Sequence, residues 1–221
     1  MYLIDKIITT KNKNIILTIT ETGKVVLKVP KNTPQATIDR VVKGKQTWIL
    51  KRKEEKSGNV KNFEKYLSKE NLLLYGETLK INFSSDIKKI IRTNTDIFLP
   101  NKCKENLEYY IKKYLKELSY EIIKHRLSYF EKLIKIKCNN FSISSARKKW
   151  GSCNNKKELK FNFRLIMLKP ELIDYVIIHE LCHIREFNHS IKFWKLVEDY
   201  DPKFKIHKAM LKENSILTSI F

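Results

Sequence analysis

The chain has 221 residues, of which 42% are hydrophobic and 11% are aromatic. These fractions exclude a disordered chain and suit a globular protein with one sizeable domain or two small ones. A formal net charge of +21 favours anionic partners such as nucleic acid. However, only seven of the 45 basic residues are arginine, and the lysines are spread from end to end. The charge by itself therefore does not assign a nucleic-acid role.

The expected location is the cytoplasm. No apolar run approaches the ~18 residues that a membrane helix needs, so no membrane association is expected. The first residues, MYLIDKIITTKNKN, lack the long apolar stretch and the cleavage site of a secretory signal. The four cysteines lie far apart without a CxxC pair, which favours free thiols in a reducing compartment: Cys103, Cys138, Cys153 and Cys182.

The front half of the chain is expected to be rich in strands. Residues 14–30 predict a β-hairpin around a glycine-containing turn. A helix is predicted over 33–56, with Pro34 at its start and a weak point at Gly44. Residues 71–84 and 87–100 predict further strands and turns.

The back half changes to helical periodicity. Apolar residues recur at three- and four-residue steps over 104–133, which predicts a long amphipathic helix. Residues 134–168 predict a strand, a turn and a second strand. Pro170 and early acidic residues begin a helix predicted over 170–187. Two shorter helices are predicted at 190–200 and 203–214.

A HExxH motif lies on the helix predicted over 170–187. A four-residue step turns a helix by only about 40° past a full turn and rises about 6 Å. His179 and His183 therefore leave the same face and can bind one ion, and zinc accepts imidazole nitrogens. Glu180 points to the side of this pair, where a carboxylate can reach a metal-bound water. The motif predicts a zinc hydrolase.

The third ligand is expected to be His189. In a continuous helix, His189 would lie about 9 Å beyond His183 and about 120° away, out of reach. The prediction therefore requires the helix to stop and the chain to fold back. Asn188 can adopt a left-handed conformation at such a stop, and Ser190 can cap the next helix.

Other side chains compete for the roles around this ion. Glu198 or Asp199 is the alternative third ligand, while Cys182 is expected to be a packed apolar residue. Zinc lowers the pKa of its water to roughly 7, and Glu180 would take that water's proton and pass it to the leaving amine. Donors that could stabilise the oxyanion are Arg147, Lys149, Tyr175, Tyr200 and His207.

Three motifs in order, KKWGSC, LKFNFRLIMLKPELIDYVIIHELCH and NHSIKFW, resemble the YgjP-like zinc metallopeptidases, relatives of the SprT-like proteins. With GKVVLKVP and LLLYGETLKI upstream, the resemblance covers about 15–214. It implies His179, His183 and His189 as ligands of one zinc ion and Glu180 as the catalytic base. Cys182 stands where the family commonly has alanine.

The remaining motif features are expectations about packing. The resemblance gives no role for the WGSC segment, and we expect a strand beside the active-site helix, with Gly151 allowing close approach. The histidine spacing equals that of the metzincins, but Glu186 replaces their glycine after the second histidine. The helix must therefore end by another route, which favours the hypothesis of a stop at Asn188.

Together these features predict an α+β fold and a zinc metallopeptidase. A β-rich N-terminal region at 1–100 precedes a zincin-like region at 101–221, whose HExxH helix packs on a small sheet. The partner is a protein or peptide substrate. The alternatives are a DNA-associated SprT-like protease, a basic nucleic-acid-binding module with a structural metal, and a non-proteolytic amidohydrolase. A structural site would have four protein ligands, typically including cysteine.

Overall fold

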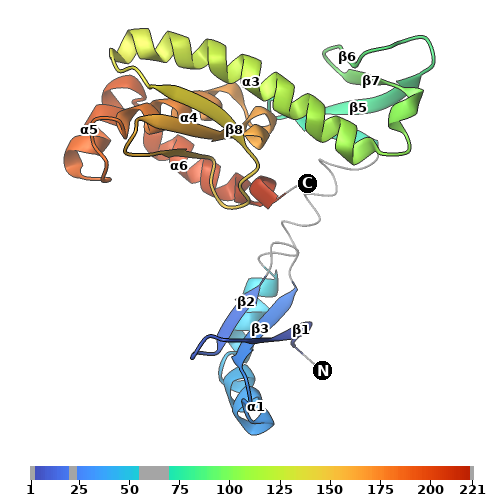
Figure 1. The fold of residues 1–221 in the computed structure, drawn as a ribbon, viewed down its shortest axis with the longest axis vertical. Coiled ribbons are helices and arrows are strands. Elements are labelled where there is room, and N and C mark those ends of the chain that lie inside the picture. Colours follow the sequence, from blue (N-terminus) through green and yellow to red (C-terminus); the bar gives the residue numbers. More distant parts are fainter. Residues whose placement is uncertain (1–2, 20–23, 55–69, 220–221) are drawn as a thin grey trace. The chain divides into compact units, whose positions relative to one another are not determined.

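The computed structural model describes residues 3–19, 24–54 and 70–219 (Figure 1). The chain divides into two compact units, Met1–Lys65 and Tyr66–Phe221. The fold is a mixed α+β fold with small sheets and helices in both units. Among the described residues, no helix is both long and apolar enough to cross a bilayer.

The N-terminal unit contains a three-stranded sheet in the order β1-β3-β2. Its strands are β1 (Lys6–Thr10), β2 (Ile16–Ile19) and β3 (Val25–Pro30). Antiparallel pairing of β2 with β3 confirms the predicted hairpin, although its turn at 20–23 lies outside the described residues. The prediction missed β1, which pairs parallel to β3. Central β3 alternates in burial, and its inward side chains Val25, Leu27 and Val29 are buried.

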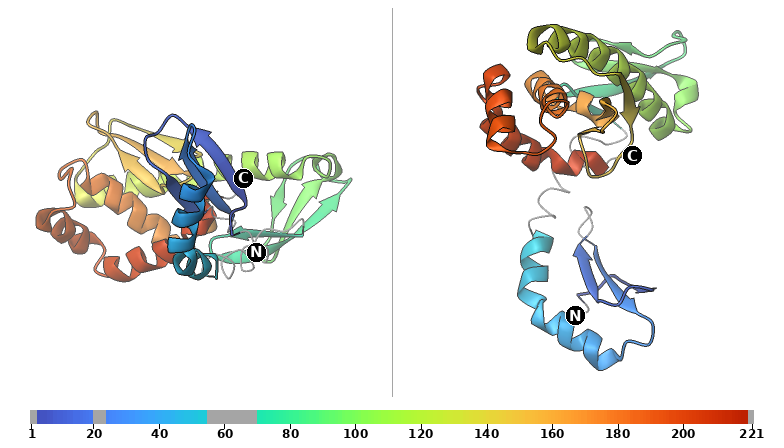
Figure 2. Two further views of the ribbon diagram at one scale, coloured as in Figure 1. Left: turned by 90° about the horizontal axis from the view of Figure 1, so that it is seen from below. Right: turned by 60° about the vertical axis from the view of Figure 1, so that its left-hand side comes forward.

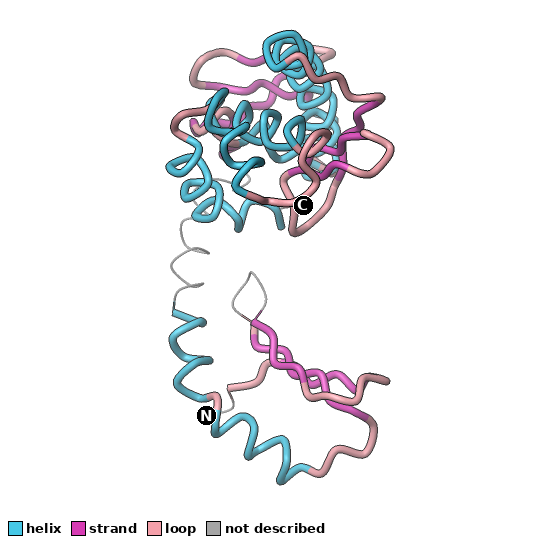
Figure 3. Tube along the Cα trace, turned by 90° about the vertical axis from the view of Figure 1, so that its left-hand side faces the viewer, coloured by secondary structure: helices cyan, strands magenta, loops and turns pink. Residues whose placement is uncertain are grey.

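The helical part of this unit is interrupted where the sequence predicts a weak point. Helix α1 (Gln35–Gly44) ends at the glycine, and helical conformation resumes over 46–54. The last two residues of the predicted helix, 55 and 56, lie outside the described residues. Ile38 and Ile49 are buried, one in each segment. The helical segments lie along one side of the strands (Figure 3).

The second unit begins with a four-stranded sheet in the order β4-β5-β7-β6. The strands are β4 (Asn71–Leu74), β5 (Glu77–Ser84), β6 (Ile91–Arg92) and β7 (Asp96–Pro100). Tyr75 and Gly76 form the two-residue connection between β4 and β5, and both have positive φ, at 53° and 81°. Such a pair matches the right-handed twist of an antiparallel hairpin.

This sheet lies in the same compact unit as the later elements. At the β4–β5 turn, the N–H of Tyr75 donates to the carbonyl of Ile166 at 2.9 Å. The N–H of Gly76 donates to the carbonyl of Met167 at 3.0 Å. These hydrogen bonds link the turn to the 3-10 helix η2 (Phe163–Met167), far along the chain. The strands of 71–100 therefore lie in the same compact unit as the back half.

Helix α3 (Leu107–Ile134) is the long helix that the periodicity predicts, and it runs past both sheets of the second unit (Figures 1 and 2). It contacts α4, η2 and β8. Its inward side chains recur at three- and four-residue steps and are buried: Ile111, Leu115, Ile123, Leu127, Phe130 and Ile134. Lys135, with a φ of 57°, ends the helix in the left-handed conformation.

The second sheet of this unit has the order β8-β10-β9, with three strands where two were predicted. Its strands are β8 (Asn140–Ser144), β9 (Gly151–Cys153) and β10 (Glu158–Asn162). Strand β10 pairs parallel to β8 and antiparallel to β9. The following helices are α4 (Pro170–Cys182), α5 (Ile191–Tyr200) and α6 (Phe204–Glu213), and α4 contacts α5, α6 and β9.

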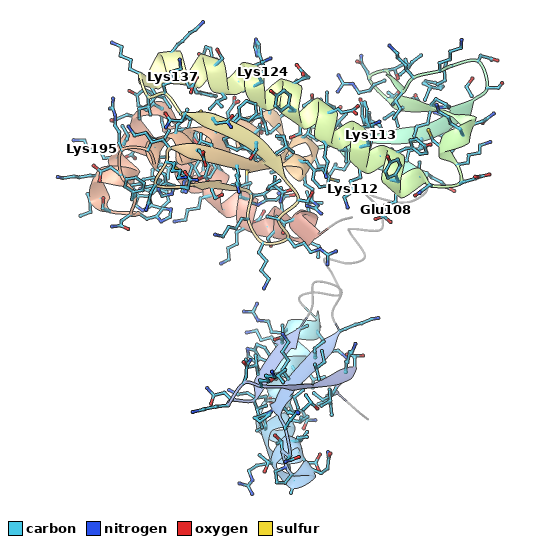
Figure 4. The ribbon with its side chains drawn as sticks, viewed as in Figure 1. Glu108, Lys112, Lys113, Lys124, Lys137 and Lys195 are labelled. Atoms are coloured by element: carbon cyan, nitrogen blue, oxygen red, sulfur yellow. The ribbon has the colours of Figure 1, made fainter. Side chains whose placement is uncertain are left out.

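Charged side chains are distributed over several elements of this unit. The residues labelled in Figure 4 lie on α3, in the loop after it, and on α5: Glu108, Lys112, Lys113, Lys124, Lys137 and Lys195. No single element carries these labelled lysines. Three of the five labelled lysines lie on α3, one lies in the loop after it, and one lies on α5.

Candidate metal centre

Helix α4 carries the first two histidines. Pro170 stands in its first turn, where a missing N–H costs nothing, and Glu171 complements the helix dipole. Most of the helix is buried, which fixes its rotation relative to its neighbours. His179 lies in the last turn and His183 at the C-cap, so both rings project from one face.

The helix ends earlier than predicted and without a left-handed residue. The N–H groups of Arg185 and Glu186 both donate to the carbonyl of Cys182, at 3.1 and 3.0 Å. The N–H of Ser190 then donates to the carbonyl of Asn188 at 2.7 Å. Asn188 is not among the described residues with positive φ, so the predicted conformation of Asn188 was wrong. The last helix-type hydrogen bonds are those accepted by Cys182, and the chain then leaves the helix without a residue of positive φ.

The fold-back brings the three histidine rings together. The Nε2 atom of His179 lies 3.2 Å from Nε2 of His183 and 3.1 Å from Nε2 of His189. All three ligand atoms lie within 4.8 Å of one another. Nitrogens bound to one tetrahedral zinc ion at ~2.0–2.1 Å would stand about 3.3 Å apart. The spacing therefore fits a single ion of this size.

The environment of His179 and His183 favours the neutral form that a metal requires. His183 donates from Nδ1 to the carbonyl of Glu186 at 3.1 Å, which leaves the lone pair of Nε2 directed at the cluster. Burial, and then the neighbouring His183 and His189, lower the pKa of His179 to about 3. Burial also lowers the pKa of His183. Protons therefore compete weakly for these two nitrogens at neutral pH.

Glu180 is 6% exposed and has a strand directly beside its carboxylate. A Cβ added at Gly151 would stand 2.5 Å from Oε1 and 2.6 Å from Cγ of Glu180. Glycine is therefore required where β9 passes the helix, as the sequence predicts for Gly151. Burial raises the pKa of Glu180 to about 8, although the positive charge of Lys149 opposes this shift.

Asn162 holds the segment that leads into β9. Its Nδ2 donates to the carbonyls of Ala146 and Lys149, at 2.6 and 2.9 Å. Its backbone N–H donates to the carbonyl of Trp150 at 2.8 Å. Asn162 is fully buried, so these bonds satisfy an amide that would otherwise be costly to bury. Asn162 and the pairing of β9 with β10 thus hold the segment that places Gly151 beside Glu180.

The alternative ligands lie outside the cluster. Among the described residues, the group that could hold a metal consists of the three histidines. Glu198 and Asp199 are exposed on α5. Cys182 is fully buried, as expected of a packing residue.

Of the five expected oxyanion donors, Tyr175 contacts a ring of the histidine cluster, and His207 contacts Tyr175. The Tyr175 ring centroid is 5.8 Å from that of His179 and 6.1 Å from that of His207. Asp201 accepts a 2.7 Å hydrogen bond from Nδ1 of His207. Burial, with smaller contributions from Asp201 and Glu180, raises the pKa of Tyr175 to about 12, so its hydroxyl remains a donor.

Of the other expected donors, Lys149 influences Glu180 through its charge. Arg147 has a structural contact, because its carbonyl accepts a 2.9 Å hydrogen bond from the Thr218 hydroxyl. Tyr200 lies at the end of α5. The sequence reasoning missed Phe193 and Trp194, which pack on the histidine rings. The available signal was their position three and four residues after Ser190, in the first turn of the predicted helix.

A model of the YgjP-like metallopeptidase domain matches residues 13–214 of this sequence. The chain belongs to the YgjP-like family. Membership supports a metallopeptidase in general and implies a metal, which the three histidines of this YgjP-like chain could bind. No curated protein matches the sequence.

One solved structure is similar to part of this YgjP-like chain. It is the crystal structure of the metallopeptidase zymogen of Pyrococcus abyssi abylysin, with 18% sequence identity. The alignment covers 41% of this chain and 93% of that chain, with a TM-score of 0.38.

Proposed function

We propose that this chain is a zinc-dependent metallopeptidase that hydrolyses peptide bonds with Glu180 as the general base. The observation that carries the proposal is the convergence of three Nε2 atoms, from His179, His183 and His189, next to a buried glutamate. Family membership supports the peptidase class. Three imidazole ligands suit zinc, and a site with three protein ligands leaves a fourth position for water or substrate.

The protein's part in the reaction follows from the position of Glu180. A bound zinc ion supplies a Lewis acid and lowers the pKa of coordinated water. Glu180 would accept a proton from the attacking water as the water oxygen bonds to the peptide carbonyl carbon, and would pass this proton to the amine as the carbon–nitrogen bond breaks. Burial raises the pKa of Glu180 in the metal-free chain, and a raised pKa makes a carboxylate a stronger base. Tyr175 and His207 are our candidates for donors to the developing oxyanion.

The central test replaces Glu180 by glutamine, which keeps the size of the side chain and removes the base. We expect E180Q to retain one zinc ion per chain and to lose roughly 10²–10⁴-fold in peptidase activity. Metal content by mass spectrometry and hydrolysis of an unstructured protein substrate would measure the two effects. Full peptidase activity in E180Q would refute the assignment of the base.

The matched control is E198Q, which makes the same chemical change on an exposed residue of α5. We expect it to keep both zinc and activity. Loss of zinc from E198Q, together with retained zinc in a His189→Ala variant, would transfer the third ligand role to Glu198.

A nucleic-acid-binding module with a structural metal is the competing function from another class. No specific contact favours it, since the metal-binding group found among the described residues has three histidines and no cysteine. Association with DNA and a cytoplasmic location stay predictions from charge, cysteine usage and resemblance. Salt-dependent DNA binding by a zinc-loaded chain without peptidase activity would favour the binding module.

A further inference from the structure

The first turn of α5 places two aromatic side chains against the histidine cluster. Phe193 is fully buried, and its ring is stacked on His183, with centroids 4.4 Å apart and an interplanar angle of 26°. The same ring meets His179 and His189 edge-on, at 4.9 and 4.8 Å. Phe193 therefore contacts all three rings.

Trp194 contacts two of the three rings but stacks on only one of them, because it meets the His179 ring at 5.9 Å with an interplanar angle of 54°. Its ring is stacked on His189, with centroids 5.3 Å apart and an interplanar angle of 25°. It is also stacked on Phe204 of α6, at 5.4 Å and 18°. The Nζ atom of Lys208 lies 4.1 Å from the Trp194 ring centroid, a favourable cation–π distance. Two contacts from α6 thus hold the indole that lies against His189.

His189 needs such a contact more than His183 does. A metal-binding histidine usually donates its second ring nitrogen to a carbonyl or carboxylate, which fixes the ring's orientation. His183 has this bond, to the carbonyl of Glu186. In the part of the chain that the structure describes, the His189 ring has hydrogen-bonding geometry only toward His179, through Nε2. His189 is also exposed and lies between two helices.

We infer that Trp194 is a positioning residue that holds the His189 ring in its metal-binding orientation by stacking. The inference rests on the proposed function, because it assumes that His189 is a metal ligand. Without the indole, the exposed ring regains rotational freedom that must be lost when the ion binds. The metal affinity should fall, while His179 and His183 keep their positions on α4.

The test compares Trp194→Ala and Trp194→Phe in the full chain. Zinc affinity is measured by chelator competition, and the absorption spectrum of the cobalt-substituted protein reports ligand geometry. We expect W194A to bind zinc about 10–100-fold more weakly, as other supporting partners of metal ligands do. W194F keeps a flat stacking ring and should stay within a few-fold of the wild type. The control Trp48→Ala, at a residue that is 43% exposed in the N-terminal unit, should leave zinc affinity unchanged.

A double-mutant cycle with His189→Ala separates positioning from general stability. If Trp194 acts through His189, adding W194A to H189A should cause no further loss of zinc affinity. Additive losses, or wild-type zinc affinity in folded W194A, would overturn the inference. If W194A does not fold, Trp194→Leu replaces it, because leucine still packs on Phe204 but offers no flat ring.

The outcomes also distinguish this inference from the proposed function. A wild-type chain that binds no zinc would overturn both. A wild-type chain that binds zinc and hydrolyses peptides, with unchanged zinc affinity in W194A, would overturn only the role of Trp194. Circular dichroism of the metal-free variants would verify that each of them is folded.

Discussion

Gly151 shows how a single atom can matter beside a catalytic group. A methyl group at this position would stand 2.5 Å from Oε1 and 2.8 Å from Cδ of Glu180, so the carboxylate would have to move. We expect Gly151→Ala to retain zinc and to lower kcat roughly 10²-fold, the usual cost of displacing a catalytic group by about 1 Å. Steady-state kinetics and metal analysis of the variant would measure both quantities.

The matched control for this residue is Gly44→Ala. A Cβ at Gly44 meets nothing within 4 Å, and the residue ends α1 in the N-terminal unit. Peptidase activity should therefore be unchanged in this variant. Equal activity of G151A and the wild type would mean that the catalytic carboxylate does not need its observed position beside β9.

At the scale of the element, the start of α5 links helix stability to the position of His189. The Ser190 side chain accepts a hydrogen bond from the N–H of Phe193 at 3.3 Å, as the predicted cap requires. We expect Ser190→Ala to lower the free energy of unfolding of the metal-free protein by about 1 kcal/mol. Urea denaturation followed by circular dichroism would measure this loss.

Ser190→Ala should also weaken zinc binding, because His189 directly precedes the cap residue and a frayed helix start would hold its ring less firmly. Ser190→Thr keeps a hydroxyl acceptor and should stay within a few tenths of a kcal/mol of the wild type. If S190A and S190T lose the same stability, the hydrogen bond from Phe193 is not the cause. If S190A lowered the zinc affinity but left the free energy of unfolding unchanged, a capping role for Ser190 would also be excluded.

For the whole molecule, the two compact units should respond differently to metal removal. All three histidines belong to the unit Tyr66–Phe221. Zinc at 100 times its dissociation constant stabilises the state that binds it by about 2.7 kcal/mol. We expect a chelator to lower the unfolding temperature of this unit and to leave that of the N-terminal unit unchanged.

Calorimetry with and without chelator would measure both transitions. Trp48 is the tryptophan of the N-terminal unit, so a Trp48→Phe variant reports the second unit alone by fluorescence. Equal shifts of both unfolding temperatures would show that the two units unfold together. The two units would then be distinct in their contacts but not independent in their stability.

Local signals in the sequence account for much of this structure. The start of α4 at Pro170, the interruption at Gly44 and the cap at Ser190 depend on backbone preferences that each residue carries by itself. The spacing of His179 and His183 also follows from helix periodicity alone. These features were predictable because their causes lie within one or two turns of chain.

Tertiary structure decided the rest, because the causes lie far apart in the sequence. The chain leaves the helix before His189 without the left-handed Asn188 that the sequence suggested. The β4–β5 turn joins the second unit through bonds to η2, about 90 residues away. The approach of Gly151 to Glu180 and the stacking of Trp194 on His189 arise only when β9, α4 and α5 pack together. Periodicity and capping preferences describe one segment at a time, so they contain no information on such contacts.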